Sequence, residues 1–251
     1  MQPNRLFNLF RANAKAGEFR AEGNTLYVYD VIVSSKADAE WLGGCDAETF
    51  VQTLNGMTGD VAVRLNSPGG DVFAGVAMAT AIKAYPGKVT AHVDGYAASA
   101  ASVVAAAADS VTMAPGAFQM IHKAWTMALG NADDFMSTAS LLEKIDGTLA
   151  DGYAAAAASR GKDSDAAAFG DLMAAETWLT AQEAIDLGLA DEIGATAPKA
   201  KAAWDLSAYA KPPVQDAIET PEIIDAPEPP AVVNETEHRQ RIHALRLRTP
   251  A

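Results

Sequence analysis

Two serines stand in a run of small residues, AHVDGYAASAASVVAAAA, between residues 91 and 108. The run begins like a strand and ends in alanines, so Ser99 and Ser102 are its main groups capable of chemistry. A strand ending at Gly95 and a helix beginning near Ser99 would place the Ser99 hydroxyl at a helix N-terminus, where unpaired N–H groups favour negative charge. Acyl-transfer enzymes need this environment for the nucleophile and the oxyanion. Tight packing of a helix on a sheet would explain the same small residues, so both interpretations stay open.

A second feature is a pair of glycines in LNSPGGDVFAG, residues 65–75, between a predicted strand and a predicted helix. Gly69 and Gly70 would let backbone N–H groups face a ligand without obstruction by side chains. The run is not a phosphate-binding loop, because it lacks both a following Gly-Lys-Ser/Thr and the GxGxxG spacing. A tight strand–helix turn is the alternative interpretation.

A nucleophilic serine also needs a general base. His122 ends the apolar run FQMI, and this position would put it at the end of a strand that faces the same cleft. His92 lies within an alternating strand, and His238 and His243 lie near the end of the chain. An α/β-hydrolase would place its histidine last, after the acid, and here that order would require His238 or His243. An isolated histidine is most often structural, but a serine, a histidine and a glycine loop at strand ends together favour catalysis.

The elements that must position these groups follow the hydrophobic pattern. Asp46 and Thr180 are predicted helix N-caps, and Gly188 is a predicted C-terminal stop. Strands alternating with helices indicate βαβ units, a parallel sheet and right-handed crossovers. The predicted strands span 26–33, 61–67, 89–94, 110–114 and 117–122, and the predicted helices span 46–57, 71–85, 133–159 and 164–175, with further helices after Ser99 and after Thr180.

Composition narrows the function classes. The formal net charge of −13 argues against nucleic acid or an anionic membrane as the main partner. Cys45 is the one cysteine, so no intramolecular disulfide can form and a reducing compartment such as the cytoplasm is expected. No apolar run reaches the ~18 residues of a membrane span, and the first residues lack the apolar core of a signal peptide. Neither HExxH nor CxxC occurs, so neither a metal nor an organic cofactor is expected.

The chain is predicted to have three parts. Residues 1–22 form an N-terminal arm, and residues 23–196 form the folded domain. The composition changes after about Ala197: residues 212–230 are rich in proline and acid, and residues 238–248 are basic. Such a composition cannot form a packed core, so residues 197–251 are predicted to be a disordered tail.

Taken together, these motifs resemble the family of the Clp protease proteolytic subunit. NSPGGD, GYAAS, MIHKAW and ETWLTAQEAIDLGLADEIG occur in the family's order over about residues 24–195. The resemblance is closer still to the Clp-related head maturation proteases of tailed phages. It implies an α/β fold of the ClpP/crotonase type, a stack of βαβ units with a protruding handle helix at residues 133–159. It also implies assembly of identical subunits into rings that enclose the active sites.

The resemblance also implies residue roles. Ser99 would be the nucleophile, His122 the base, and the N–H groups of Gly70 and Ala100 the oxyanion hole. An extended substrate backbone would lie between the glycine loop and the strand after His122, as added β-strands do. The residues that would contact it are Gly69, Asp71, Val72, Lys123 and Ala124.

The third member of the triad is where this sequence departs from the bacterial pattern. The family has an aspartate shortly before an aromatic-Leu-Ser-Ala segment, and the matching segment here begins at Trp178. Glu176 precedes it by two residues, and a glutamate can orient an imidazole as an aspartate does. Asp171 is the rival, and a purely structural role for Glu176 is the remaining alternative.

The sequence therefore predicts a serine endopeptidase that acts through an acyl-enzyme. The resemblance implies that its substrates are capsid or scaffold proteins of a maturing phage head. It gives no ground for expecting an unfoldase ATPase partner, because no docking determinants are recognisable. Two alternatives stay open: an acyl-CoA enzyme of the crotonase type, which shares the fold, and a catalytically silent assembly scaffold.

Overall fold

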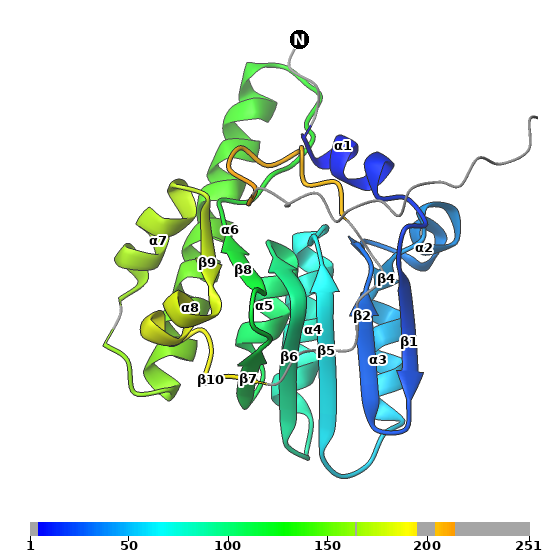
Figure 1. Cartoon of the computed structure of the whole chain (residues 1–251). Coiled ribbons are helices and arrows are strands. Elements are labelled where there is room, and N and C mark those ends of the chain that lie inside the picture. Colours follow the sequence, from blue (N-terminus) through cyan, green and yellow to red (C-terminus); the bar gives the residue numbers. More distant parts are fainter. Residues whose placement is uncertain (1–4, 164, 195–203, 214–251) are drawn as a thin grey trace, which may run out of the picture. The chain divides into compact units, whose positions relative to one another are not determined.

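The computed structural model describes residues 5–163, 165–194 and 204–213, and these build one mixed sheet flanked by helices (Figure 1). The sheet has the order β1 (Glu18–Glu22), β2 (Thr25–Tyr29), β5 (Val61–Ser67), β6 (Val89–Ala98), β7 (Ser110–Met113) and β10 (Glu192–Ile193). From β2 to β10 the neighbouring strands run parallel, while β1 is antiparallel to β2. The predicted parallel βαβ arrangement is confirmed, and the fold class with it.

Strand β6 is longer than predicted and changes partner along its length. Its first half pairs with β7, and its second half, from Tyr96 to Ala98, pairs with β8 (Phe118–Ile121). The strand thus continues past Gly95, where we expected it to end. A side chain at Gly95 would meet the Asn66 amide oxygen at 2.6 Å, and this oxygen accepts the N–H of Tyr96. Gly95 therefore allows close approach within the strand and does not end it.

Two parallel strands, β6 and β8, end at the same edge of the sheet, beside each other. Strand β9 (Thr177–Thr180) pairs antiparallel with β8 and extends the sheet at this edge. A smaller sheet pairs β3 (Ile32–Val33) with β4 (Cys45–Asp46). This arrangement brings the residues after β6 and β8 together, as the sequence predicts for Ser99 and His122.

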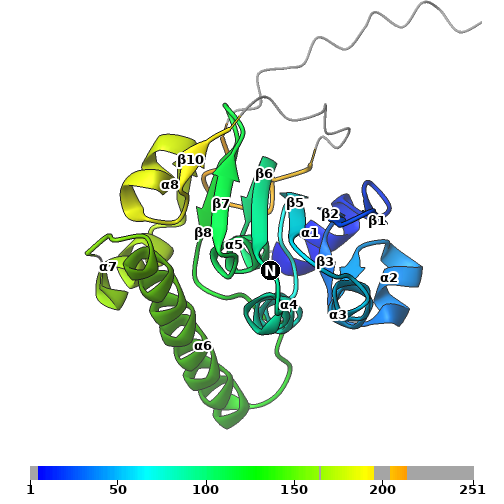
Figure 2. The same ribbon diagram turned by 90° about the horizontal axis from the view of Figure 1, so that it is seen from below.

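Three helices lie on one face of the sheet: α3 (Ala47–Asn55), α4 (Val72–Ala84) and α5 (Ala100–Ala106) (Figures 1 and 2). Asp46 and Asp71 cap α3 and α4 by accepting N–H groups of the first turn, as N-cap residues do. Three further helices, α2 (Lys36–Leu42), α7 (Ala166–Ala174) and α8 (Ala181–Leu187), surround the sheet. Thr180 caps α8 and Gly188 ends it in the left-handed conformation, as predicted.

Helix α6 (Ala132–Ser159) is the predicted handle and projects away from the sheet (Figure 2). Leu149 and Tyr153, near its C-terminal end, are buried against the domain. Phe135 and Leu141, nearer its tip, are 52% and 51% exposed. The apolar side chains of this helix are thus divided between packing within the domain and an exposed surface.

Both predicted boundaries of the folded domain need correction. Residues assigned to an N-terminal arm form α1 (Arg5–Ala12) and β1, and β1 pairs with β2 along its whole length. Residues 204–213, assigned to the tail, pack through Trp204, Leu206 and Tyr209 against Leu9 in a small second core. Composition hides this packing because these apolar side chains stand among alanines and polar residues. Residues 197–203 and 214–251 of the predicted tail lie outside the described residues.

None of the helices described is both long and apolar enough to cross a membrane.

Candidate active site

Ser99 occupies the sharp turn between β6 and α5. Its φ of 53° lies in the left-handed region, which residues other than glycine adopt at a cost. Hydrogen bonds hold the turn on both sides: the Ser99 N–H donates to the Met120 carbonyl at 2.8 Å, and the Ser99 carbonyl accepts the Ser102 N–H at 2.9 Å. This strand–turn–helix geometry lifts the side chain above the sheet edge, as in nucleophile elbows.

His122 directly follows β8 and meets Ser99 across the edge of the sheet. Its Nε2 lies 2.7 Å from the Ser99 Oγ, within hydrogen-bond distance. The two residues are brought together because β6 and β8 run parallel and in register from Tyr96 to Ala98. A serine and a histidine at this distance are arranged for proton transfer from the hydroxyl to the imidazole.

Burial sets the electrostatic state of the imidazole. His122 is 8% exposed, and loss of solvation lowers its pKa to about 4. The Glu176 charge opposes this shift and the Arg5 charge adds to it. The Trp125 ring meets the imidazole edge-on, with ring centres 4.5 Å apart. The imidazole is therefore neutral near pH 7, which is the form that can accept the serine proton.

The two glycines are required by close backbone approach. Their φ values are 91° at Gly69 and 147° at Gly70, and a side chain at Gly70 would lie 1.9 Å from the Ile32 carbonyl oxygen. The Ile32 N–H donates to the Gly69 carbonyl, and the Asp71 N–H donates to the Ile32 carbonyl. In this parallel bridge the N–H of Gly70 points away from β3.

Two backbone N–H groups beside Ser99 are suited to stabilise an oxyanion. Gly70 and Ala100 line the same small cavity as Ser99 and His122. Ala100 is the first residue of α5, where the N–H has no partner within the helix. The two residues predicted to form the oxyanion hole thus line one cavity with Ser99 and His122.

The predicted substrate contacts are divided between cavities, and some of their N–H groups are engaged within the chain. Asp71 and Val72 line a cavity beside the site, Ala124 lines the small cavity of Ser99 and His122, and Lys123 borders another cavity near α7. Gly70–Phe73, Trp125–Met127 and α6 line a cavity of about 220 Å³. The N–H of Lys123 donates to the Met173 carbonyl, and that of Ala124 donates to the Asp146 carboxylate. The N–H of Asp71 is also occupied, as described above. A substrate strand would therefore have to pair with other backbone groups of these segments.

Glu176 does not contact His122 in this structure. Its φ is 49°, and its two carboxylate oxygens accept the N–H groups of Ala210 and Lys211 at 3.0 and 2.7 Å. In the described part of the chain no hydrogen bond joins Glu176 to His122, and its influence there is through charge. The rival Asp171 lies exposed within α7. The expected Glu176–His122 contact is thus replaced by contacts to a segment beyond the predicted domain.

That segment supplies a residue that the sequence reasoning missed. Tyr209 is buried, and its ring centre lies 5.5 Å from that of His122 and 5.1 Å from that of Trp125. Its hydroxyl donates to the Pro68 carbonyl at 2.5 Å. The run WDLSAYA at 204–210, with three large apolar residues at short spacing, was the one available signal.

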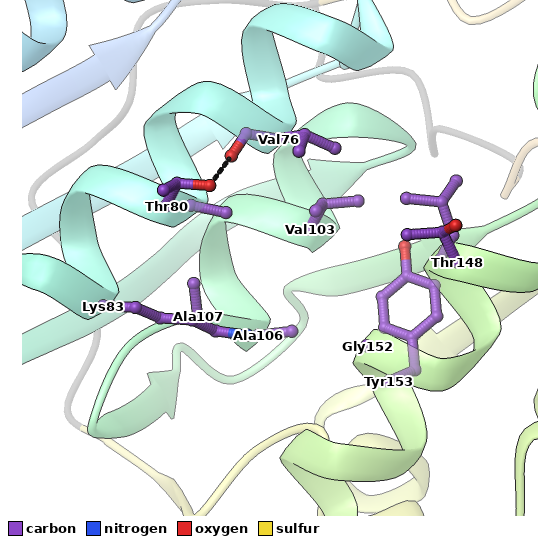
Figure 3. A pocket seen from close by; sticks show the side chains of 11 residues that line it. Val76, Thr80, Lys83, Val103, Ala106, Ala107, Thr148, Gly152 and Tyr153 are labelled. Carbon is purple, nitrogen blue, oxygen red and sulfur yellow. Dashed lines mark hydrogen bonds between the residues drawn. The ribbon is translucent and has the colours of Figure 1, made fainter. Parts of the chain in front are cut away.

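Ser102, the other serine of the alanine-rich run, faces the handle helix. Its hydroxyl lies 2.6 Å from the Ser99 carbonyl oxygen and 2.7 Å from the Tyr153 hydroxyl. Tyr153 also borders a separate apolar cavity of about 130 Å³ between α4, α5 and α6 (Figure 3). Ser102 is therefore a support of the turn and is not paired with His122.

Comparison with known proteins identifies the family of this chain. Residues 47–197 match the family model of the Clp protease. The ATP-dependent Clp protease proteolytic subunit of Bacteroides fragilis is 34% identical over 137 residues, covering 53% of this chain and 63% of that protein. The subunit from Bacteroides thetaiotaomicron is also 34% identical, with 60% of that protein covered. The chain thus spans about three fifths of the length of these relatives.

The solved structures agree on the fold. A ClpP1 variant from Listeria monocytogenes superposes with a TM-score of 0.55 at 21% identity, over 68% of this chain and 91% of that one. The family-model match takes in Ser99, His122 and Glu176, and it ends before residues 204–213. Because the family model covers more than half of the chain, this chain belongs to the Clp protease family.

Proposed function

We propose that this chain is a serine endopeptidase. The observation that carries the proposal is the 2.7 Å contact between the Ser99 Oγ and the His122 Nε2 beside the N–H groups of Gly70 and Ala100. Ser99 attacks a peptide carbonyl as His122 takes its proton, and the two N–H groups bind the oxyanion. His122 then protonates the leaving amine, and water hydrolyses the acyl-enzyme by the same route. These steps use side chains and backbone only.

Glu176 is our candidate for the third member of the triad. Support comes from its position before β9 and from its charge, which already acts on the pKa of His122. In the present arrangement it binds Ala210 and Lys211, so the role requires that these contacts break.

We further propose capsid or scaffold proteins of a maturing phage head as substrates, a homo-oligomeric ring as the active assembly, and the cytoplasm as the place of action. The sequence resemblance supports the substrate class and the ring, and the single cysteine, which excludes an intramolecular disulfide, supports the compartment. The relatives are named ATP-dependent. Our proposal includes no ATPase, because the chain carries no recognisable docking determinants for one.

A serine-directed fluorophosphonate tests the chemistry. We expect the probe to label Ser99, as located by mass spectrometry, and the Ser99→Ala variant to stay unlabelled. The matched control is Ser137→Ala, an exposed serine on α6, which should label as the native chain does. Absence of labelling in every folded form would contradict the proposal. Thermal stabilisation by acyl-CoA without labelling would instead favour a crotonase-type enzyme, and neither response would favour a silent scaffold.

A further inference from the structure

Residues 204–213 lie across the edge of the sheet that carries Ser99 and His122, beside α1 (Figure 1). Tyr209 is the centre of this segment: it is 4% exposed and its ring meets His122, Trp125 and Trp178 at centre distances of 5.1 to 5.5 Å. Its hydroxyl is bonded to the Pro68 carbonyl, directly before the two glycines. The segment therefore touches the base and the loop that holds the oxyanion hole.

Polar contacts fasten the segment on both sides of Tyr209. Before it, the Asn13 amide donates to the Asp205 carbonyl at 2.9 Å and accepts the Asp205 N–H at 2.8 Å. After it, Glu176 accepts the N–H groups of Ala210 and Lys211, and the Lys211 ammonium donates to the Ala175 carbonyl at 2.6 Å. Such paired contacts fix a defined position over the site.

The position leaves no room for a peptide. Leu6 and Leu9 of α1, together with Tyr209, wall the cavity that contains Ser99 and His122, and its volume is about 20 Å³. Such a volume holds roughly one water molecule. A scissile carbonyl must come to about 3 Å from the nucleophile with its flanking residues extended, so it cannot enter while the segment is in place.

The same segment also occupies the candidate third member of the triad. Both Glu176 oxygens accept N–H groups of residues 210 and 211, and among the described residues the carboxylate held in this way makes no hydrogen bond to His122. The same segment thus closes the cleft and holds Glu176 away from His122.

Release of the segment would not require unfolding of the domain. Leu9, Met120, Trp204, Leu206 and Tyr209 form a small cluster separate from the main core around β5, β6 and α5. Local opening of such satellite clusters costs less than global unfolding. The segment is therefore built to open while the sheet and the Ser99 turn stay intact.

We propose that residues 204–213 are an intramolecular latch that closes the active site and holds Glu176 away from His122. Its release opens the cleft to substrate and frees Glu176 to orient His122, so access and completion of the triad are one event. The inference rests on the proposed serine protease function and adds its regulation.

The test compares full-length variants in the rate of fluorophosphonate labelling at Ser99. Tyr209→Ala should label about tenfold faster than the native chain or more, because it removes the buried ring that packs against His122 and Trp125. Asn13→Ala should change the rate in the same direction from the other end of the segment. The matched control is Tyr85→Ala, which also removes a ring and a hydroxyl-to-carbonyl bond but lies at the end of α4. Circular dichroism confirms that each variant is folded.

A second measurement tests whether release of the latch frees Glu176 to orient His122. In the latched chain, burial lowers the pKa of His122 to about 4. In Tyr209→Ala, the pH at which the labelling rate falls on the acid side should lie above this value. Adding Glu176→Gln should move this fall back to lower pH. A faster rate whose fall stays at the same pH would overturn the role of Glu176 in the latch.

The possible outcomes distinguish failure of the latch proposal from failure of the proposed protease function. Equal labelling of the native chain and of both latch variants overturns the latch and leaves the protease proposal standing. Slower labelling in folded Tyr209→Ala also overturns it, because Tyr209 would then support catalysis. Absence of labelling in all forms refutes the proposed function itself.

Discussion

At the scale of single residues, strained backbone gathers at the site. Among the residues described, three that are not glycine have a positive φ: Lys15, Ser99 and Glu176. Two of these three are candidate members of the triad. Such conformations cost on the order of 1–3 kcal/mol and persist where surrounding contacts fix them. At Ser99 those contacts are Met120 and Ser102, and at Glu176 they include the N–H groups of the latch.

The nucleophile can be tested against its neighbour. Ser99→Ala should lower kcat for a small peptide ester by about 10⁴–10⁶ without loss of folding, because the hydroxyl is the attacking group. Ser102→Ala should lower it far less, because its hydroxyl bonds to the Ser99 carbonyl and to Tyr153. Steady-state kinetics together with melting temperatures check both variants. Inactive Ser102→Ala with active Ser99→Ala would contradict the assignment.

The burial of His122 predicts a pH dependence of stability. Its pKa is about 4 in the folded chain and near 6.5 when unfolded, so the unfolded state binds the extra proton in that interval. The stabilising contribution of the neutral imidazole is complete above about pH 6.5 and is lost as the pH falls through 4.

Denaturant melts of the native chain and His122→Gln measure this effect. Between pH 7 and 4.5 the native chain should lose on the order of 1–3 kcal/mol more free energy of unfolding than the variant. The comparison cancels the opposite trend of Asp30, whose pKa burial raises to about 6. Parallel pH profiles of the two chains would show that His122 is not held neutral by burial.

At the scale of elements, the turn after β5 depends on its glycines. Gly70→Ala should abolish acylation and lower stability by about 1–3 kcal/mol, because its side chain would meet the Ile32 carbonyl in a backbone region that favours glycine. Gly116→Ala is the matched control: its φ is also positive, but no atom lies within 4 Å of the added carbon. Labelling rates and melts of both variants separate backbone strain from displacement of the oxyanion hole. Normal labelling of Gly70→Ala would remove Gly70 from that role.

Some features of the strands that carry the site can be predicted from the sequence, and others cannot. The meeting of Ser99 and His122 was predictable because each follows a run with a local strand pattern, and parallel strands end at one edge. The extension of β6 past Gly95 was not, because it depends on a change of partner from β7 to β8.

The contacts of Glu176 were also beyond prediction. Its hydrogen-bond partners lie 34 and 35 positions further along the chain. They belong to a stretch whose composition is typical of a tail, and neither periodicity nor a motif marks it. The sequence could thus place Glu176 near the site, but it could not reveal that the N–H groups of Ala210 and Lys211 bind its carboxylate oxygens.

At the scale of the whole molecule, apolar side chains are gathered on one exposed region. They lie on α4, on the segment before α6 and on the outer half of α6. Large exposed apolar patches on a protein surface usually mark an interface. The residues are Phe73, Met127, Leu129, Phe135, Met136 and Leu141, each more than half exposed. Leu149 and Tyr153 are already buried within the subunit, so on α6 it is the outer part that is exposed for association.

We therefore expect the chain to form a homo-oligomer through this region. The net charge of −13 opposes association of identical chains, so the mass measured by light scattering at micromolar concentration should rise from low to moderate salt. Leu141→Glu should shift the population toward the monomer, because it places a charge on the exposed outer part of α6. The matched control is Thr148→Glu, an exposed position closer to the domain on the same helix, which should leave the mass unchanged. A monomeric mass of the native chain at both salt concentrations would contradict the prediction. A mass unaffected by Leu141→Glu would place the interface on another surface.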